Sequence, residues 1–429
     1  MPSGLPYHPP VTAPATTVEP PPHHEEPLAR NRDFRVLLTS QGVSALGDAV
    51  SFTALPLLVL ALTGSGLAMG LVGALQTLPD LVFGMVAGAL ADRNDRKRMM
   101  FLADLGRAVL TASIPISVLV GGPTMIVILV VAAPMSVLRA LFLAGYTASV
   151  PALVGRSQTA RANSYFEAIY SVGYIVGPAV AGVLSATIGP GPTLGIDAVS
   201  FALSGLALAF VRRDLRAPVD RPPASLLEDI REGIEYILAH PTLRAIIAFW
   251  GIVSISTAPL VTALAVYVTR DLDYPDTILG LILTAYGIGT VGGALLTSRA
   301  GRRPVGPILL GGTFATGIFL VIVATTDQVP VLLAVAVGSG LAQSMVLVTY
   351  ITLRTALSPD ALLGRIGSTA RTISLGLQPI GLLVGGALID LTSGATTIAV
   401  MGVVLAGLSL VFVPVRALRR AAIQPRPPG

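Results

Sequence analysis

Twelve long apolar runs, separated by short clusters of charge, glycine or proline, constrain this chain more than any other feature of its sequence. Each run reaches the roughly 20 residues that a helix needs to cross the hydrocarbon core of a bilayer. A helix satisfies its own backbone hydrogen bonds in lipid, and the runs lack the alternation of a barrel strand. The sequence therefore predicts an all-α membrane protein with 12 transmembrane helices, near residues 36–62, 67–91, 99–121, 124–150, 163–188, 191–211, 244–269, 277–298, 305–325, 329–353, 366–390 and 395–415.

The composition excludes several classes of protein. Charged residues make up 12% of the chain, about half of the share in soluble domains. The net charge of +5 comes from basic clusters between the apolar runs, which indicates membrane topology and not nucleic-acid binding. The chain has no cysteine, and three of its four histidines lie in the first 24 residues. With no nucleophile pattern, phosphate loop or metal cluster in sight, we expect no cofactor, no bound metal and no enzymatic activity.

The basic clusters fall after alternate runs, so they predict the orientation of the chain. Arg270 is the one arginine expected on the side opposite to the clusters. Under the positive-inside rule both termini lie in the cytoplasm, and the protein is a multi-pass protein of the inner cell membrane. The predicted organisation is a disordered Pro-rich tail (1–30), a six-helix bundle (31–211), a cytoplasmic linker (212–243), a second six-helix bundle (244–416) and a cytoplasmic tail (417–429).

The two halves of the chain repeat one another. Matches at a nearly constant offset occur in four separate helix regions, and they pair Tyr146 with Tyr350, Arg161 with Arg365, Gly177 with Gly381, and Gly88-Ala-Leu with Gly293-Ala-Leu. Co-linear matches of this kind indicate duplication of a six-helix unit. Two such units in parallel are a transporter architecture.

The loop between the second and third runs reads Gly88-Ala-Leu-Ala-Asp92-Arg93-Asn94-Asp95-Arg96-Lys97-Arg98. It resembles the signature loop of the major facilitator superfamily. Gly47-Asp48, Asp104-x-x-Arg107, and Pro151-Ala-Leu-Val followed by Ala-Arg161-Ala-Asn163 are similar to the branch that contains macrolide efflux proteins and the enterobactin exporter. The resemblance covers residues 30–415 and implies two pseudo-symmetric six-helix bundles, a major facilitator fold and a monomer. At Asp95, where many members carry glycine, we expect a left-handed turn that aspartate tolerates.

The signature loop suggests a conformational latch. Asp92 ends a helix, so it can accept hydrogen bonds from the N-terminal amides of another helix or pair with an arginine of the other half, either Arg365 or Arg371. Such a contact favours the outward-facing state. The latch set comprises Gly88, Asp92, Arg93, Arg96, Arg98, Asp104, Arg107, Arg365 and Arg371, with the basic run held by anionic lipid headgroups and Asp104–Arg107 as a structural pair supporting the loop. The alternative is a plain topological stop signal.

Charged residues inside the runs mark the predicted coupling site, because charge at membrane depth is costly and usually functional. The candidates for proton coupling are Asp48, Asp80, Arg139 and Glu167. Asp48 is the preferred titrating group, and Arg139 resembles the buried fourth-helix arginine of antiporters in the superfamily. Two static alternatives stay open: Asp48 capped by hydroxyls or paired with Arg139, and Arg139 paired with Asp80.

The fifth run carries a small-residue motif, Gly173, Gly177, Pro178 and Gly182, that resembles the Gly-Pro motif of antiporters. Small residues let helices approach closely and proline permits bending, although generic helix packing explains the pattern as well. Aromatic and amide residues at membrane depth predict a substrate cavity with mostly apolar walls. They are Phe52, Phe142, Tyr146, Tyr170, Tyr174, Trp250, Tyr286, Gln343, Tyr350 and Gln378.

Together these features predict a secondary active efflux transporter. The expected substrate is an amphipathic, drug-like organic solute, exchanged for protons by alternating access of two bundles. Two alternatives remain: export of an endogenous siderophore or secondary metabolite, and a non-transporting membrane sensor or assembly partner on the same fold.

Overall fold

The computed structural model describes residues 26–215, 226–299, 305–359 and 362–415. Within these ranges it does not describe the side chains of residues 80, 85 and 226–230. Most of the two predicted tails, and the side chain of Asp80, therefore lie outside the described part of the chain.

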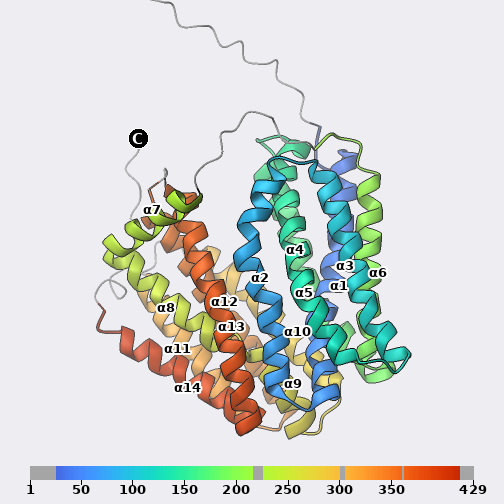
Figure 1. Cartoon of the computed structure of the whole chain (residues 1–429). Helices are drawn as coiled ribbons and strands as arrows, with labels where there is room; N and C mark the ends of the chain where they lie inside the picture. Colours follow the sequence, from blue (N-terminus) through green and yellow to red (C-terminus); the bar gives the residue numbers. More distant parts are fainter. Residues whose placement is uncertain (1–25, 216–225, 300–304, 360–361, 416–429) are drawn as a thin grey trace, which may run out of the picture.

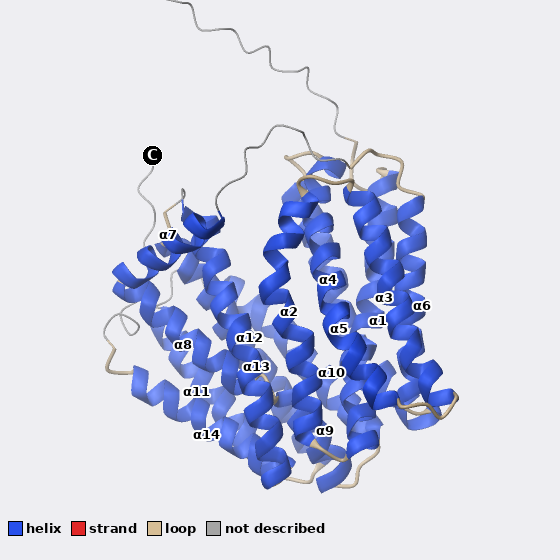
Figure 2. Ribbon diagram, in the orientation of Figure 1, coloured by secondary structure: helices blue, strands red, loops and turns tan. Residues whose placement is uncertain are grey.

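The described chain consists of helices joined by short turns and loops, and 12 of its helical segments are long and apolar enough to cross a membrane (Figures 1 and 2). The prediction of an all-α membrane protein is confirmed. The membrane-crossing elements are α1 (Arg32–Thr63), α2 (Gly66–Ala91), α3 (Arg96–Leu119), α4 (Thr124–Val154), α5 (Thr159–Ile188), α6 (Pro190–Ala209), α8 (Pro241–Thr257) with α9 (Leu260–Val266) and η1 (Tyr267–Asp271), α10 (Asp276–Arg299), α11 (Val305–Ala324), α12 (Val329–Leu357), α13 (Leu363–Leu391) and α14 (Gly394–Phe412).

The same helix pairings occur in both halves, as the sequence repeat predicts. In the first half α2 packs on α4, and α3 packs on α4 and α6; in the second half α10 packs on α12, and α11 packs on α12 and α14. The halves meet through α2 against α13 and α5 against α10 (Figure 1). The chain thus forms two six-helix bundles with matching internal packing.

Local sequence explains where the first helices begin and end. The side chain of Asn31 accepts a hydrogen bond from the Phe34 amide and caps α1, and Gly64 ends that helix with a left-handed φ of 64°. The expectation for Asp95 was wrong. Its φ is −67°, and its side chain accepts from the Arg98 amide as the N-cap of α3. Aspartate is used here as a helix cap and not for a left-handed turn.

Two features of the second half were not predicted. The seventh run is broken, because α8 gives way to α9 at Pro259, which lacks the amide that a continuous helix needs. The predicted linker contains a helix, α7 (Leu226–Ala239), which packs against α13 and α8. Charges on α7 hid it from a search for apolar runs.

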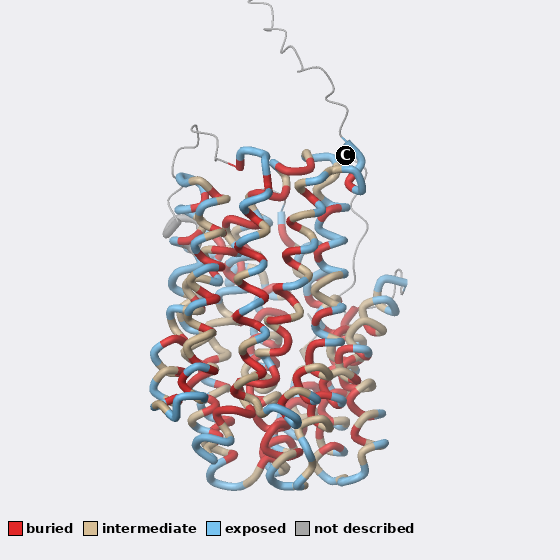
Figure 3. Tube along the Cα trace, turned by 90° about the vertical axis from the view of Figure 1, so that its right-hand side faces the viewer, coloured by how far each residue is buried: buried red, intermediate tan, exposed pale blue. Residues whose placement is uncertain are grey.

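The outer surface of the bundles is apolar. Side chains such as Val130, Val199 and Val411 are 59–70% exposed, because they face the bilayer and not other helices. Figure 3 shows exposed residues along the outer edges of the helices and buried residues between them. Lipid replaces protein as the packing partner on these faces.

The two ends of the molecule differ. We call the end that carries residues 92–95 and α7 the basic end, and the end that carries Gly64 and Asp390 the opposite end. The contacts between bundles lie toward the opposite end, where Gly66 meets Gly386, Gly70 meets Leu382, and Pro178 meets Gly280. In Figure 1 the two bundles converge there and diverge toward the basic end. The molecule is closed at its opposite end.

Candidate functional site

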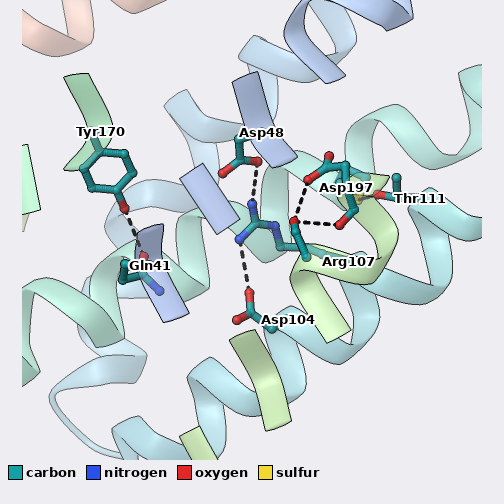
Figure 4. A network of polar contacts seen from close by, with 9 residues as sticks. Gln41, Asp48, Asp104, Arg107, Thr111, Tyr170 and Asp197 are labelled. Carbon is teal, nitrogen blue, oxygen red and sulfur yellow. Dashed lines mark hydrogen bonds and ion pairs between the residues drawn. The ribbon is translucent and has the colours of Figure 1, made fainter. Parts of the chain in front are cut away.

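Arg107 is the centre of a charged network in the first bundle (Figure 4). One guanidinium nitrogen lies 2.9 Å from the Asp48 carboxylate of α1, and another lies 3.2 Å from the Asp104 carboxylate one turn earlier in α3. The Arg107 side chain is 4% exposed and that of Asp104 is fully buried, whereas that of Asp48 is 45% exposed. Arg107 therefore joins a fully buried carboxylate to an accessible one.

Aromatic rings hold the guanidinium in place. Its central carbon lies 3.7 Å from the ring centroid of Phe201 in α6 and 5.7 Å from that of Phe142 in α4. Cation–π contacts of this kind compensate part of the cost of burying a charge. Phe142 was predicted as a cavity wall; it is buried and faces Arg107.

Two predictions about these charges need correction. Asp104 and Arg107 do pair, but near the middle of α3, so they support Asp48 and not the loop at the basic end. Asp48 forms its ion pair with Arg107, whereas one of the static alternatives paired it with Arg139. The sequence placed Arg107 too near the surface because α3 already begins at Arg96. Arg139 and Glu167 are exposed in this conformation.

Sequence reasoning left Asp197 out of the site. It is 2% exposed, and Ser200 donates a 3.2 Å hydrogen bond to its carboxylate. Gly47 makes room for this pair: a Cβ on Gly47 would lie 2.7 Å from Asp197 Oδ1 and closer still to the Ser200 hydroxyl. The sequence did contain a signal for it, a charged residue inside the sixth apolar run. The structure adds that Asp197 lies beside Gly47 of the first helix.

A polar and aromatic face continues from Asp48. The Tyr170 hydroxyl of α5 donates to the Gln41 side chain of α1 at 3.0 Å. The rings of Phe52 and Tyr174 pack edge to face at 6.4 Å, and they are 49% and 56% exposed. Of the predicted cavity residues, these two combine contact with each other and wide exposure.

Other predicted cavity residues pack within the bundles. Tyr146 is buried against Phe142 and Phe166, and Tyr350 is buried and stacked on Trp250 at 4.9 Å. Tyr286, Gln343 and Gln378 are partly buried. A separate groove of about 540 Å³ between α11 and α12 is lined by apolar residues such as Phe319, Leu341 and Met345, and none of the predicted site residues lines it.

The signature loop is held within its own bundle. Asp92 lies 3.6 Å from Arg96, which is 8% exposed and donates to the carbonyls of Ala91 and Ala148. Arg96 therefore ties the end of α2 to α4, and its buried guanidinium is not available to lipid headgroups. Arg93 and Arg98 are exposed.

The predicted partners of Asp92 lie in different surroundings. Arg365 forms an ion pair with Glu232 of α7, and Arg371 is exposed. The latch from Asp92 to Arg365 is not formed in this conformation, because Asp92 lies beside Arg96 and Arg365 pairs with Glu232.

The small-residue motif of α5 faces two helices. Gly173 and Gly177 touch the backbone of α1 at Ala45 and Ala49, while Pro178 and Gly182 meet Gly280 of α10 in the other bundle. The motif serves both packing inside the first bundle and the contact between bundles. Helix packing alone explains these contacts, so they do not indicate the direction of transport.

A twelve-helix, two-bundle fold with a charged network at mid-membrane defines a secondary transporter. A sequence profile described as Major Facilitator Superfamily matches residues 37–374 and 251–428. The chain therefore belongs to this superfamily, which consists of transporters and not enzymes.

Its relatives include efflux proteins. The chain is 29% identical to the multidrug efflux pump Tap of Mycolicibacterium fortuitum, over 88% of this chain and 95% of Tap. It is 26% identical to the enterobactin exporter EntS of Citrobacter koseri over 88% and 91% of the two chains, and 25% identical to macrolide efflux protein A of Streptococcus pyogenes over 83% and 89%. The resemblance inferred from the signature motifs is confirmed.

Solved structures confirm the fold. A bacterial homolog of the human lysosomal transporter Spinster, in an inward-facing and occupied conformation, superposes with a TM-score of 0.71 at 13% identity, covering 93% of this chain and all of that one. At this identity the likeness concerns the fold alone.

Proposed function

We propose that this protein is a proton-coupled efflux transporter for an amphipathic organic solute, with its basic end in the cytoplasm. The observation that carries the proposal is the Asp48–Arg107 ion pair, because it joins an accessible carboxylate to a buried cation at mid-membrane. The efflux relatives and the positive-inside pattern support the direction and the orientation. With that orientation the described conformation is inward-facing.

The geometry suggests how a proton is used. A proton on Asp48 removes the negative charge that binds Arg107, while Asp104, Phe201 and Phe142 keep the guanidinium in place. Asp48 on α1 is then released from α3. Loss of the proton restores the pair, so the protonation state of one carboxylate sets the contact between two helices of the first bundle.

The solute site follows from the same face. Phe52 and Tyr174 present two half-exposed aromatic rings one helical turn from Asp48 and its neighbours, a suitable surface for a flat, partly apolar molecule. Competition between solute and proton at adjacent groups couples the two fluxes, because occupancy of one site changes the free energy of the other.

The test is transport in proteoliposomes with an imposed pH gradient, using rhodamine 6G as a fluorescent amphipathic probe. Wild-type protein is expected to move the dye against its gradient. In Asp48→Asn the gradient-driven rate is expected to fall at least about tenfold, while dye binding is retained. Asp273→Asn is the matched control, since Asp273 is an exposed carboxylate with a φ of 55° that asparagine accepts. Unchanged pH dependence in Asp48→Asn contradicts the coupling role.

The relationship to EntS supports a second candidate, export of a siderophore. The same vesicles loaded with enterobactin discriminate between the two: selective, pH-driven movement of enterobactin without dye transport favours the siderophore. Absence of any proton-linked flux for both solutes favours a non-transporting sensor on this fold.

A further inference from the structure

At the opposite end, a carboxylate of the second bundle caps a helix of the first. Asp390, in the last turn of α13, accepts hydrogen bonds from the Ser65 hydroxyl at 2.6 Å, the Gly66 amide at 2.5 Å and the Leu67 amide at 3.1 Å. These groups form the N-terminus of α2, where amides lack partners inside the helix and the helix dipole is positive. The Asp390 carboxylate accepts hydrogen bonds from these amides, and its negative charge interacts favourably with the helix dipole.

Neighbouring contacts fix the two bundles in the same place. Arg270 of η1 donates to the Gly64 carbonyl at 3.0 Å, again from the second bundle to the first. Gly66 and Gly386 allow the backbones of α2 and α13 to touch, since a Cβ on Gly66 would lie 2.9 Å from the Gly386 carbonyl. Asp390 therefore acts across an interface that is already closely packed.

At the basic end the roles of the two helices are exchanged: α2 ends there and α13 begins. Helices α2 and α13 run antiparallel, and each has an aspartate at its C-terminal end, Asp92 and Asp390. The N-terminus of α13 has no side-chain cap at Leu362, and Gly364 beside it faces open space. One helix N-terminus is capped across the bundles and the other is left without a side-chain cap.

We infer that Asp390 is the latch that keeps the opposite end closed, and that its contact with the N-terminus of α2 must break whenever that end opens. The inference rests on alternating access as proposed above, but not on the identity of the solute or of the coupling ion. The contact stabilises only the state that is closed at the opposite end. Its loss raises the free energy of that state relative to the open state, and the population of open molecules therefore rises.

A spin-label distance measurement on the full chain in lipid nanodiscs tests the latch. The chain has no native cysteine, so Val120→Cys and Thr325→Cys place two labels specifically at exposed loop positions of the two bundles at the opposite end. Asp390→Asn is expected to raise the ratio of long to short distances about fivefold, as for the loss of a charged helix cap. Ser65→Ala, which keeps the carboxylate, is expected to raise it about twofold.

Asp271→Asn is the matched control. The Asp271 carboxylate accepts a 3.0 Å hydrogen bond from the Ala395 amide near the start of α14, so it provides the same kind of cap within one bundle. Its removal is expected to leave the distance distribution unchanged. Unchanged distances in both Asp390→Asn and Ser65→Ala overturn the latch, and an equal shift in Asp271→Asn overturns its specificity.

Failure of the latch and failure of the proposed function are distinguishable. The distances are measured without a pH gradient or solute, so they report on Asp390 even in a protein that transports nothing. Conversely, loss of coupling in Asp48→Asn leaves the prediction for Asp390 intact.

Discussion

The two bundles share their packing but not their chemistry. In the first bundle α1, α3 and α6 contribute Asp48, Arg107 and Asp197 deep in the membrane. Their counterparts in the second bundle are α8 with α9 and η1, α11, and α14. Helices α11 and α14 carry no charge, and the segment from α8 to η1 is charged only near its ends, at Arg244, Arg270 and Asp271. In the other membrane-crossing helices of the described second bundle, Arg371 is the one charge more than a turn from a helix end. Duplication preserved the scaffold, whereas the ionic network belongs to one half.

The difference suggests a division of labour. Burial of the Arg107 guanidinium is compensated by carboxylates of α1 and α3, whereas the described part of the second bundle has no buried charged side chain. The second bundle supplies apolar surface, the α7 helix and the carboxylate that caps α2. The three predictions below test this comparison by removing charge, space and one hydrogen bond from the first bundle.

The largest effect is expected for Arg107→Leu. It leaves the fully buried Asp104 without its cation, which typically costs about 3–5 kcal/mol. Thermal unfolding of the purified protein in detergent measures the loss. Arg371→Leu is the control from the second bundle: it removes an exposed arginine and should change stability by less than about 1 kcal/mol. Equal losses in the two variants would contradict the contrast between the bundles.

A smaller effect is expected for Gly47→Ala. The added methyl group meets Ser200 and Asp197 on α6, and overpacking of this kind costs about 1–3 kcal/mol. The same unfolding assay detects it. In the second bundle Gly292→Ala meets nothing within 4 Å, so it should be neutral or stabilise the helix by up to about 1 kcal/mol. If Gly47→Ala is equally harmless, the close approach of α1 and α6 is not required.

The smallest effect is expected for Tyr170→Phe. It removes the hydrogen bond to Gln41, and such bonds between transmembrane helices contribute about 0.6 kcal/mol on average. Tyr165→Phe is the matched control, because Tyr165 lies on the same helix and is 43% exposed. A change in Tyr165→Phe as large as that in Tyr170→Phe shows that the bond to Gln41 adds nothing.

Much of the architecture could be predicted because each helix carries its own signal. Apolar runs gave the membrane-crossing segments, and the internal repeat gave the two bundles. The break at Pro259 and helix α7 were missed, since one lies inside an apolar run and the other is amphipathic. Within the site, Asp48 was recognised as a charge at depth and Asp104 and Arg107 as a pair, but the depth of that pair and its contact with Asp48 were missed. Spacing along one helix reveals i,i+3 neighbours such as Asp104 and Arg107 and is silent about the helix packed alongside.

The sequence by itself determined the class of protein, because the hydrophobic effect and the need to satisfy backbone hydrogen bonds in lipid act on every run separately. Only the tertiary structure decided which charges meet. Arg107 of α3 pairs with Asp48 of α1, and Asp197 of α6 packs against Gly47 of α1. Asp390 caps α2 from the other bundle. These contacts depend on the rotation and depth of whole helices, and those are set by packing between segments far apart in the chain.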